Sequence, residues 1–553
     1  MVSYGKASAL RDELSWTLIF VALFSSCGAW TFGWDNAWWG GILGNAYFGQ
    51  HFGAISTTVK GVTIRTLSPS QQSAGTGLGT AGIMVGCMLA GQVAHWGGRR
   101  LCFYVVALIS FFGVIIEATA GIGSTGRFYQ MAAGKFVVGV SIGVASIAVP
   151  LYQAECAPAA IRGALVNSYV TIQALGTWMA FCCLYTLVNS TGQKVWLVPI
   201  CIQMLAPLAM VSFGWMLPES PRWLVEKGRM DEARATLVRL HSGKRGGYDP
   251  DADLLNLQLA KEEAIGIHGE SKWLDCFRST DLKRTLIVLG VQCLQQGQGI
   301  SFMSSYLVVF LLQLGFSQVY LILVIVGALL TVLTSVGFFT QDFIGRRALL
   351  MIGGAIQAIC LISVGGLTFH STLSSAKVNA SVGLIFIWLI AFTQSWTNIP
   401  WTVSAELPAS RLRDKTLTIG AWGGYGVGLM IGFVNPFLQD VGYADLGGGV
   451  GFIYGSVSVI SVIFSESKMP RGVLSAAVYL FLPELKGVSL ETVDAMFDAG
   501  IAPRKMGTHP MRYQVKASVE TVQGPELGLD AKKQNLVEHI EDNKEMEDKM
   551  QIV

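Results

Sequence analysis

Charged residues are scarce in this chain of 553 residues: only 14% are Asp, Glu, Lys or Arg, whereas 52% are hydrophobic. So few charges cannot cover the surface of a water-soluble protein of this size, and the mean hydropathy of +0.50 indicates that lipid surrounds most of the chain. The net charge of +3 is small and forms no basic cluster, which argues against a nucleic-acid partner.

Motifs for metal binding, nucleotide binding and catalysis are also missing. The sequence has no G-x-x-x-x-G-K-S/T phosphate loop, which argues against a nucleotide-driven pump. Its 10 cysteines lie almost all in apolar stretches without a C-x-x-C spacing, so we predict small buried side chains and neither a metal site nor a disulfide framework. No nucleophile–base pair stands out and no cofactor is implied, so an enzyme is the weakest interpretation.

Long apolar runs recur along the chain at the ~20 residues that a helix needs to cross the hydrocarbon core. The runs are continuous rather than alternating, which favours helices over barrel strands. We therefore predict an all-α polytopic membrane protein with about twelve transmembrane helices. The predicted spans are 16–38, 72–94, 101–120, 128–151, 164–188, 195–217, 285–310, 318–340, 348–369, 382–403, 416–438 and 450–482.

The positions of basic residues predict the topology, because short loops rich in Lys and Arg stay in the cytoplasm. Such residues lie in the loops that follow the second, fourth, eighth and tenth spans. These loops are therefore predicted to be cytoplasmic, and so are both termini. The glycosylation sequons at Asn189 and Asn379 then fall in external loops. The loop residues used are Arg99, Arg100, Arg162, Arg346, Arg347, Arg411, Arg413 and Lys415.

An internal repeat divides the chain into two six-helix halves. Gly98-Arg99-Arg100 in the first half recurs as Gly345-Arg346-Arg347, and both halves contain a glutamate seven residues before an arginine, about 250 residues apart. The predicted organisation is a cytoplasmic N-terminus (1–15), a first bundle (16–217), a cytoplasmic linker with short helices (218–284), a second bundle (285–482), a cytoplasmic motif and helix (483–502) and a disordered tail (503–553).

One polar stretch breaks the repeat. The run Ser465 to Arg471 places charges inside the last predicted span, where each would cost roughly 2.5–3.5 kcal/mol even on lenient scales. We interpret about residues 465–477 as an insertion, such as a retained intron. Sequencing of the mature transcript would decide, since an uninterrupted message through this segment contradicts the intron.

Several motifs, taken in order, resemble the sugar porters of the major facilitator superfamily over roughly residues 16–500. The motifs are Phe32-Gly33-Trp34-Asp35, Pro218-Glu219-Ser220-Pro221-Arg222-Trp223-Leu224, Gln295-Gln296 and Pro483-Glu484-Leu485-Lys486-Gly487. The run 405–416 looks most like the fungal α-glucoside branch. The resemblance implies the major facilitator fold, with a central cavity exposed alternately to the two sides of the membrane.

Charged residues near the predicted cytoplasmic helix ends indicate a gate. We expect Glu155 to pair with Arg162, Glu406 with Arg413, and Asp342 to lie near Arg346 and Arg347. The alternative is that these charges only anchor the helix ends at the membrane surface. His95 replaces the acid that the family pattern has, so the first-half gate is expected to be weaker or sensitive to pH. The predicted gate residues are Arg99, Arg100, Glu155, Arg162, Glu219, Arg222, Asp342, Arg346, Arg347, Glu406, Arg413 and Glu484.

Asp35 lies inside the first apolar span, and an intramembrane carboxylate is a candidate functional group. The resemblance implies that Asp35 takes up the transported proton and that Lys135, which replaces the arginine of the family, is its partner. Protonation of Asp35 would release Lys135 and permit the change from outward to inward access. The alternative is a static ion pair that fixes two helices.

Amide and aromatic side chains at family positions indicate the sugar site, because sugars need paired amides for their hydroxyls and aromatic faces for the ring. Departures from the family pattern, such as Val170, suggest a roomier cavity, so an α-glucoside disaccharide is preferred over a hexose or pentose. The predicted substrate-binding residues are Phe32, Gln173, Gln295, Gln296, Ser301, Tyr306, Asn398, Trp401 and Tyr425.

The sequence thus predicts a proton-coupled sugar symporter, in the plasma membrane, whose partners are a sugar, a proton and the lipid bilayer. Two alternatives stay open. A uniporter would only equilibrate the sugar, whereas a sugar receptor would bind without transport, as the altered gate at His95 and the polar tail suggest.

Overall fold

The computed structural model describes residues 15–59, 62–123, 126–158, 162–242, 248–268, 272–313, 316, 318–369, 374–409, 412–439, 443–465, 482–483, 493, 496–497, 499–501 and 503–506. Most of the suspected insertion, Glu484 and nearly all of the predicted tail lie outside these residues. The chain divides into two units, residues 1–482 and 483–553. The helices and strands discussed below belong to the first unit, and the short helix α22 (Pro503–Met506) belongs to the second.

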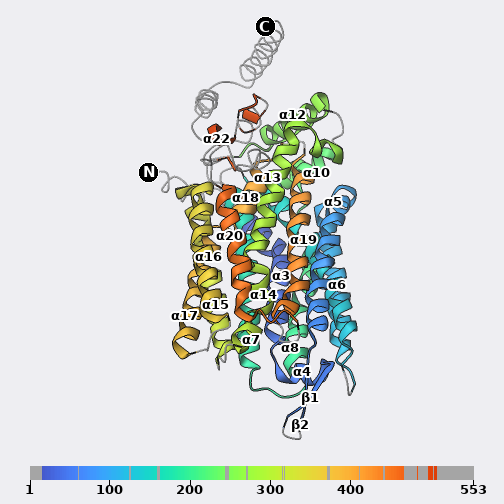
Figure 1. The fold of residues 1–553 in the computed structure, drawn as a ribbon. Helices are drawn as coiled ribbons and strands as arrows, with labels where there is room; N and C mark the ends of the chain where they lie inside the picture. Colours follow the sequence, from blue (N-terminus) through green and yellow to red (C-terminus); the bar gives the residue numbers. More distant parts are fainter. Residues whose placement is uncertain are drawn as a thin grey trace. The chain divides into compact units, whose positions relative to one another are not determined.

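The first half is built mainly from long helices that run along the bundle (Figure 1), and they coincide with the predicted spans. A break at Ser26 separates α2 from α3 within the first span. The elements are α2 (Trp16–Ser25), α3 (Cys27–Ile42), α4 (Ala46–Phe52), β1 (Ile55–Val59), β2 (Val62–Thr66), α5 (Pro69–Ala120), α6 (Phe128–Cys156), α7 (Arg162–Thr186), α8 (Lys194–Gln203), α9 (Leu205–Phe213) and η1 (Gly214–Met216).

The second half repeats this pattern of helices. It contains α13 (Ser279–Gln295), the π-helical turn η3 (Gln296–Ile300), α14 (Ser301–Gln313), α15 (Val319–Ile344), α16 (Arg346–Thr368), α17 (Ser375–Gln394), α18 (Ile399–Glu406), α19 (Arg413–Gln439), η4 (Gly447–Gly449) and α20 (Val450–Ser465). Between the halves lie α10 (Pro221–Glu226), α11 (Met230–Leu240), α12 (Pro250–His268) and η2 (Trp273–Phe277).

These helices confirm the all-α polytopic fold. Where the structure describes them, the predicted spans coincide with one helix or with two or three consecutive helical elements, and α5 contains two spans, joined by a kink at Gly98. Among the described residues, 8 continuous helical segments are long and apolar enough to cross a membrane unaided. The last predicted span, 450–482, is described only as far as Ser465, where α20 ends.

The two ends of the bundle carry different structures, and we name them accordingly (Figure 1). The linker end carries α10, α11 and α12, which share a small core of Trp223, Leu224, Val225 and Ala233. The hairpin end carries α4 and the antiparallel strands β1 and β2, in which Ile55 pairs with Thr66. The hairpin was not predicted, although eight of its ten strand residues are Ile, Val or Thr, which favour strands.

Gln71 fixes the hairpin to the start of α5. Its side-chain oxygen accepts hydrogen bonds from the backbone N–H groups of Ser68 and Ala54, both at 3.0 Å, and its amide nitrogen donates to the carbonyl of Phe52 at 2.8 Å. Ser68 completes a capping box by accepting from the N–H of Gln71. One buried glutamine thereby caps α5 and holds the connection between the first two spans.

The two halves pack against each other through long helices of each. Helix α5 packs on α19, α7 on α15 and α3 on α14. Near the hairpin end, Tyr320 donates a 3.1 Å hydrogen bond to the carbonyl of Gly41, and Ser73 donates a 2.7 Å bond to the carbonyl of Phe433. These cross-half bonds hold the bundle together at that end and leave a cavity deeper in the molecule.

Candidate functional site

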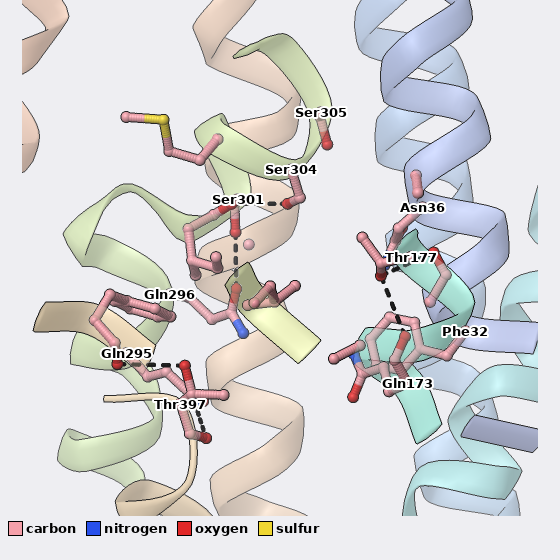
Figure 2. A pocket seen from close by; sticks show the side chains of 18 of the residues that line it. Phe32, Asn36, Gln173, Thr177, Gln295, Gln296, Ser301, Ser304, Ser305 and Thr397 are labelled. Atoms are coloured by element: carbon pink, nitrogen blue, oxygen red, sulfur yellow. Dashed lines mark hydrogen bonds between the residues drawn. The ribbon is translucent and has the colours of Figure 1, made fainter. Parts of the chain in front are cut away.

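The cavity, of about 240 Å³, lies between the two halves and is lined by residues of both. Figure 2 shows Phe32, Asn36, Gln173 and Thr177 on one side and the residues of η3 and α14 on the other. The structure brings together most of the predicted substrate-binding residues. Those that line the cavity are Phe32, Gln173, Gln295, Gln296, Ser301, Trp401 and Tyr425.

Gln295 and Gln296 sit at the junction of α13 and the π-helical turn η3. The amide nitrogen of Gln295 donates to the carbonyls of Trp396 (2.7 Å) and Thr397 (3.1 Å), which leaves its side-chain oxygen without a hydrogen-bond partner among the described residues. The side-chain oxygen of Gln296 accepts from Ser301 at 2.8 Å, and its amide nitrogen has no protein acceptor there (Figure 2). Gln295 therefore has an unused acceptor oxygen, which is buried, and the amide nitrogen of Gln296 can still donate two hydrogen bonds.

A π-helical turn follows the two glutamines of the cavity. Gln295 and Gln296 themselves have α-helical backbone angles, and η3 runs from Gln296 to Ile300. Gly299, with φ of 99°, interrupts the helix between α13 and α14, and such breaks are frequent at functional sites. The run Gly297-Gln298-Gly299 is the sequence signal for this break.

Tyr306 and Asn398 do not line the cavity. The ring of Tyr306 is completely buried and its hydroxyl donates a 2.8 Å hydrogen bond to the carbonyl of Gly432, so it joins α14 to α19. Asn398 is 5% exposed and donates to the carbonyl of Thr334 at 3.4 Å. Both residues were predicted to bind the sugar from their sequence positions. In the structure their side chains instead make contacts between helices.

Several polar cavity residues were not predicted. Thr177 bonds the carbonyls of Gly33 and Gln173, both at 3.2 Å, and so ties α3 to α7 beside the cavity (Figure 2). Isolated Thr, Ser and Asn residues in apolar helices carry no distinctive sequence signal, since most bond the backbone of their own helix. The polar and aromatic lining residues that the sequence missed include Asn36, Thr76, Thr80, Tyr169, Thr177, Ser304, Ser305, Thr334, Trp388 and Thr397.

Asp35 and Lys135 form a buried ion pair next to the cavity wall. The Nζ atom of Lys135 lies 2.7 Å from Oδ2 of Asp35, and Lys135 and Asp35 are 2% and 3% exposed, respectively. The sequence neighbours of Asp35, namely Phe32, Gly33 and Asn36, line the cavity, so Asp35 lies directly behind the cavity wall on α3. The predicted pairing of these two residues across α3 and α6 is present in the structure.

Two further side chains complete the pair. Gln203 of α8 donates a 3.0 Å hydrogen bond to Oδ1 of Asp35, and its own oxygen accepts from the indole N–H of Trp38 at 2.8 Å. The ammonium of Lys135 lies 5.2 Å from the ring centroids of both Trp38 and Trp39, within cation–π range. No sequence pattern singles out Gln203, because its contact with Asp35 arises only when α8 packs against α3 in the folded bundle.

The predicted gate residues form two matching arginine–glutamate pairs, one in each half. Arg99 makes a bidentate contact with Glu155 (2.6 and 2.8 Å), and Arg346 lies 3.2 Å from Glu406. Each arginine follows a glycine with positive φ, Gly98 (82°) or Gly345 (108°), a conformation that favours glycine. The internal repeat therefore extends to the ion pairs.

Arg99 is a partner of Glu155 that was not expected. It bonds both carboxylate oxygens of Glu155, whereas the pairing of Glu155 with Arg162 stays a prediction. The kink at Gly98 turns Arg99 back toward the end of α6, which the spacing of Glu155 and Arg162 could not reveal. The side chains of Arg162 and Asp342 lie outside the described residues.

The remaining gate residues have other contacts. Glu219 accepts hydrogen bonds from the backbone N–H groups of Arg99 (2.9 Å) and Arg100 (3.2 Å), so it caps the second part of α5. Arg222 lies 3.7 Å from Glu226 on the exposed surface of α10. Arg347 donates to the carbonyl of Ser465 at 2.8 Å, and Arg413 begins α19. The sequon residues Asn189 and Asn379 are exposed.

The fold and the site define a polytopic membrane transporter with a cavity between two pseudo-repeated halves, largely apolar but with several polar side chains. The sequence profile of the sugar (and other) transporter family matches residues 20–497, so the chain belongs to that family and is a sugar transporter.

Curated relatives agree with this assignment. The chain is similar to the hexose transporter HXT10 of Saccharomyces cerevisiae, at 27% identity over 89% of this chain and 87% of the relative. It is also similar to the high-affinity fructose transporter ght6 of Schizosaccharomyces pombe, at 28% identity over 94% of both chains. Among solved structures, the proton:xylose symporter XylE has a TM-score of 0.69 at 22% identity, covering 87% of this chain and 99% of that chain, which establishes the major facilitator fold.

Proposed function

We propose that this protein is a proton-coupled sugar symporter of the plasma membrane. The observation that carries the proposal is the buried Asp35–Lys135 pair, in which Asp35 directly precedes the cavity-lining residue Asn36 of α3. A buried carboxylate that depends on one ammonium for its charge is well suited to bind a transported proton, because neutralising either partner frees the other. XylE, which shares the fold, is described as a proton:xylose symporter, and this is consistent with the proposed mechanism.

The proposed topology puts the linker end in the cytoplasm and the hairpin end outside. Basic residues at the linker end, among them Arg99 and Arg346, support this orientation. The hydrogen bonds from Tyr320 and Ser73 then close the outer end of the cavity, and the Arg99–Glu155 and Arg346–Glu406 pairs belong to the inner gate. Glycosylation of Asn189 and Asn379 is part of the same proposal.

We propose a hexose as the principal substrate. The sequence favoured an α-glucoside, but the curated relatives are named as hexose, glucose and fructose transporters. The side-chain oxygen of Gln295 and the amide nitrogen of Gln296 could bond two neighbouring hydroxyls, while Trp401 and Phe32 offer apolar faces to the ring. Uptake of maltose, an α-glucoside disaccharide, tests whether the protein also transports the larger substrate that the sequence favoured.

Sugar uptake tests the proposal directly. Yeast that lacks its own sugar transporters would express the full chain and receive labelled glucose, fructose or maltose, with and without a protonophore. We expect accumulation of a hexose above the external concentration and its collapse with the protonophore. Uptake that only equilibrates would indicate a uniporter, and binding without uptake by protein at the cell surface would indicate a receptor. Accumulation of maltose but no hexose would restore the disaccharide interpretation.

Substitution of Gln296 by Ala should raise the KM for the transported sugar about tenfold, because one or two hydrogen bonds of about 1 kcal/mol each are lost. Deoxy sugars make the test specific. For the deoxy isomer that lacks the hydroxyl bound by Gln296, the wild type and the variant should have the same KM. An equal rise of KM for the sugar and for every deoxy isomer would show that Gln296 acts on the shape of the cavity rather than on a hydroxyl.

A further inference from the structure

Glu117 is a completely buried carboxylic acid that has no role in the mechanism proposed above. It lies on α5, three residues before the end of that helix at Ala120, and its side chain is 0% exposed. Neither of its carboxyl oxygens has a hydrogen-bond partner among the described residues. A buried carboxylate without partners is very unfavourable, so such a group carries a proton or depends on a nearby positive charge.

The nearby charges are those of the proposed proton site. The residues whose charges act on Glu117 are Asp35 of α3 and Lys135 of α6. Glu117 packs against Gly134, where an added Cβ would lie only 2.6 Å from its Cγ atom, and Lys135 is the next residue of α6. Glu117 of α5 therefore lies beside the turn of α6 that carries Lys135, while Asp35 of α3 contacts Lys135 directly.

Lys135 has the donors to serve both acids. An ammonium group carries three N–H donors. Among the described contacts, Lys135 directs hydrogen bonds to the Oδ2 atom and the backbone carbonyl of Asp35, at 2.7 and 3.3 Å. One donor is left, and the two tryptophan rings beside Nζ stabilise a cation without occupying an N–H group.

The count of charges then requires a proton. Two carboxylates and one ammonium would leave one uncompensated negative charge in the membrane interior, at a cost of several kcal/mol. One proton on either acid makes the group neutral. Since Asp35 holds the ammonium in this structure, Glu117 is the acid that carries the proton.

We propose that Glu117 is a second proton-carrying acid of the symport site and passes its proton to Asp35 through Lys135. In this step Lys135 gives Asp35 the proton of their hydrogen bond and takes the proton of the Glu117 carboxyl. One N–H and one O–H bond break, one O–H and one N–H bond form, and the net charge stays zero. The ammonium is then paired with the Glu117 carboxylate and Asp35 is neutral. The inference rests on the proposed symport and extends it.

The depths of the two residues fit this direction of transfer. With a rise of 1.5 Å per residue, Glu117 lies about 4.5 Å from the hairpin end of α5, and Lys135 about 10 Å from the hairpin end of α6. His51 of α4 contacts the carbonyl of Gly121 at 3.1 Å, one turn beyond Glu117. A proton that enters from the hairpin end therefore reaches the level of Glu117 before that of Lys135.

The test is the variant Glu117→Gln in the full-length chain, compared with Ser110→Ala. Ser110 is two turns earlier on the same face of α5, is 1% exposed and has a hydroxyl without a partner among the described residues, so it is a matched control. For E117Q we expect at least a tenfold loss of the sugar accumulation ratio and of proton uptake per sugar, with equilibrative exchange retained. The pH profile of exchange should lose one ionisation, which His51→Gln should not remove. S110A should stay within twofold of the wild type.

The outcomes separate this inference from the proposed function. If the wild type itself only equilibrates sugar, the symport and this inference are both wrong. If the wild type accumulates sugar and E117Q does so equally, with the same pH profile, only this inference is wrong. If E117Q loses exchange as well, the variant Glu117→Asp distinguishes a chemical role from a packing role. Sugar accumulation by Glu117→Asp near the wild-type level would support the need for a carboxyl group. Loss of exchange in Glu117→Asp too would indicate a packing role and overturn the proposal.

Discussion

Replacement of Asp35 by Asn should abolish uphill sugar accumulation while sugar exchange continues. An asparagine keeps the shape of the side chain and its oxygen can still accept from Lys135, but it cannot bind and release a proton. One charge moved through 100 mV is worth about 2.3 kcal/mol, and one pH unit adds about 1.4 kcal/mol. The wild type can therefore reach several-hundred-fold accumulation, and the variant should fall to a ratio of about one.

The measurement is the steady-state ratio of labelled sugar inside and outside proteoliposomes with an imposed pH gradient and potential. The wild type with a protonophore is the matched condition, because it should behave as the Asp35→Asn variant does without one. Exchange of labelled for unlabelled sugar shows that the variant is folded and that its sugar site still alternates between the two sides of the membrane. Undiminished accumulation by Asp35→Asn would mean that the Asp35–Lys135 contact is a static link between α3 and α6.

The fold and the central ion pair could be predicted because they depend on strong local signals. Apolar runs near 20 residues long leave few alternatives to membrane-spanning helices, and every predicted span coincides with helix where the structure describes it. Asp35 is conspicuous as a carboxylate inside such a run, and Lys135 follows from its family position. Gln295 and Gln296 were found in the same way, and they line the cavity.

The residues that the sequence did not reveal act through contacts between distant helices. Gln203 is an ordinary polar residue in sequence, yet it reaches Asp35 across 168 positions of the chain. Glu117 also lies inside a predicted span, but only three residues from its end, where an acid is expected to reach the membrane surface. Arg99 was expected in the gate, but its partner Glu155 depends on the positive φ of Gly98, which only the folded backbone shows.

The contact between α3 and α7 at Gly33 is the basis of the second large effect. A Cβ atom at Gly33 would lie 1.9 Å from the carbonyl oxygen of Gln173 and 3.0 Å from the backbone nitrogen of Thr177. Both atoms belong to the backbone of α7, so no side-chain rotation can relieve the overlap. The two helices thus approach each other at Gly33 as closely as their backbones allow, which small residues make possible in membrane bundles.

Replacement of Gly33 by Ala should therefore lower the thermal stability of the purified transporter and reduce its transport rate at least tenfold. Overpacking of this kind costs about 1–3 kcal/mol, and more where backbone has to move. The displaced segments carry Phe32 and Gln173 of the cavity wall and Asp35 of the ion pair, so binding and coupling should suffer together. Thermal unfolding in detergent and initial uptake rates at several sugar concentrations measure the two effects.

Gly91→Ala is the matched control for this prediction. Gly91 lies within α5, and a Cβ atom there would meet nothing within 4 Å, so an alanine gains up to about 1 kcal/mol of helix propensity without a clash. We expect wild-type transport and equal or higher thermal stability for this variant. If Gly33→Ala behaved like Gly91→Ala, α7 would have to move away from α3 at little cost. The cavity wall would then be flexible at this contact, and Thr177, whose hydroxyl bonds the carbonyl of Gly33, would be the residue that limits the movement.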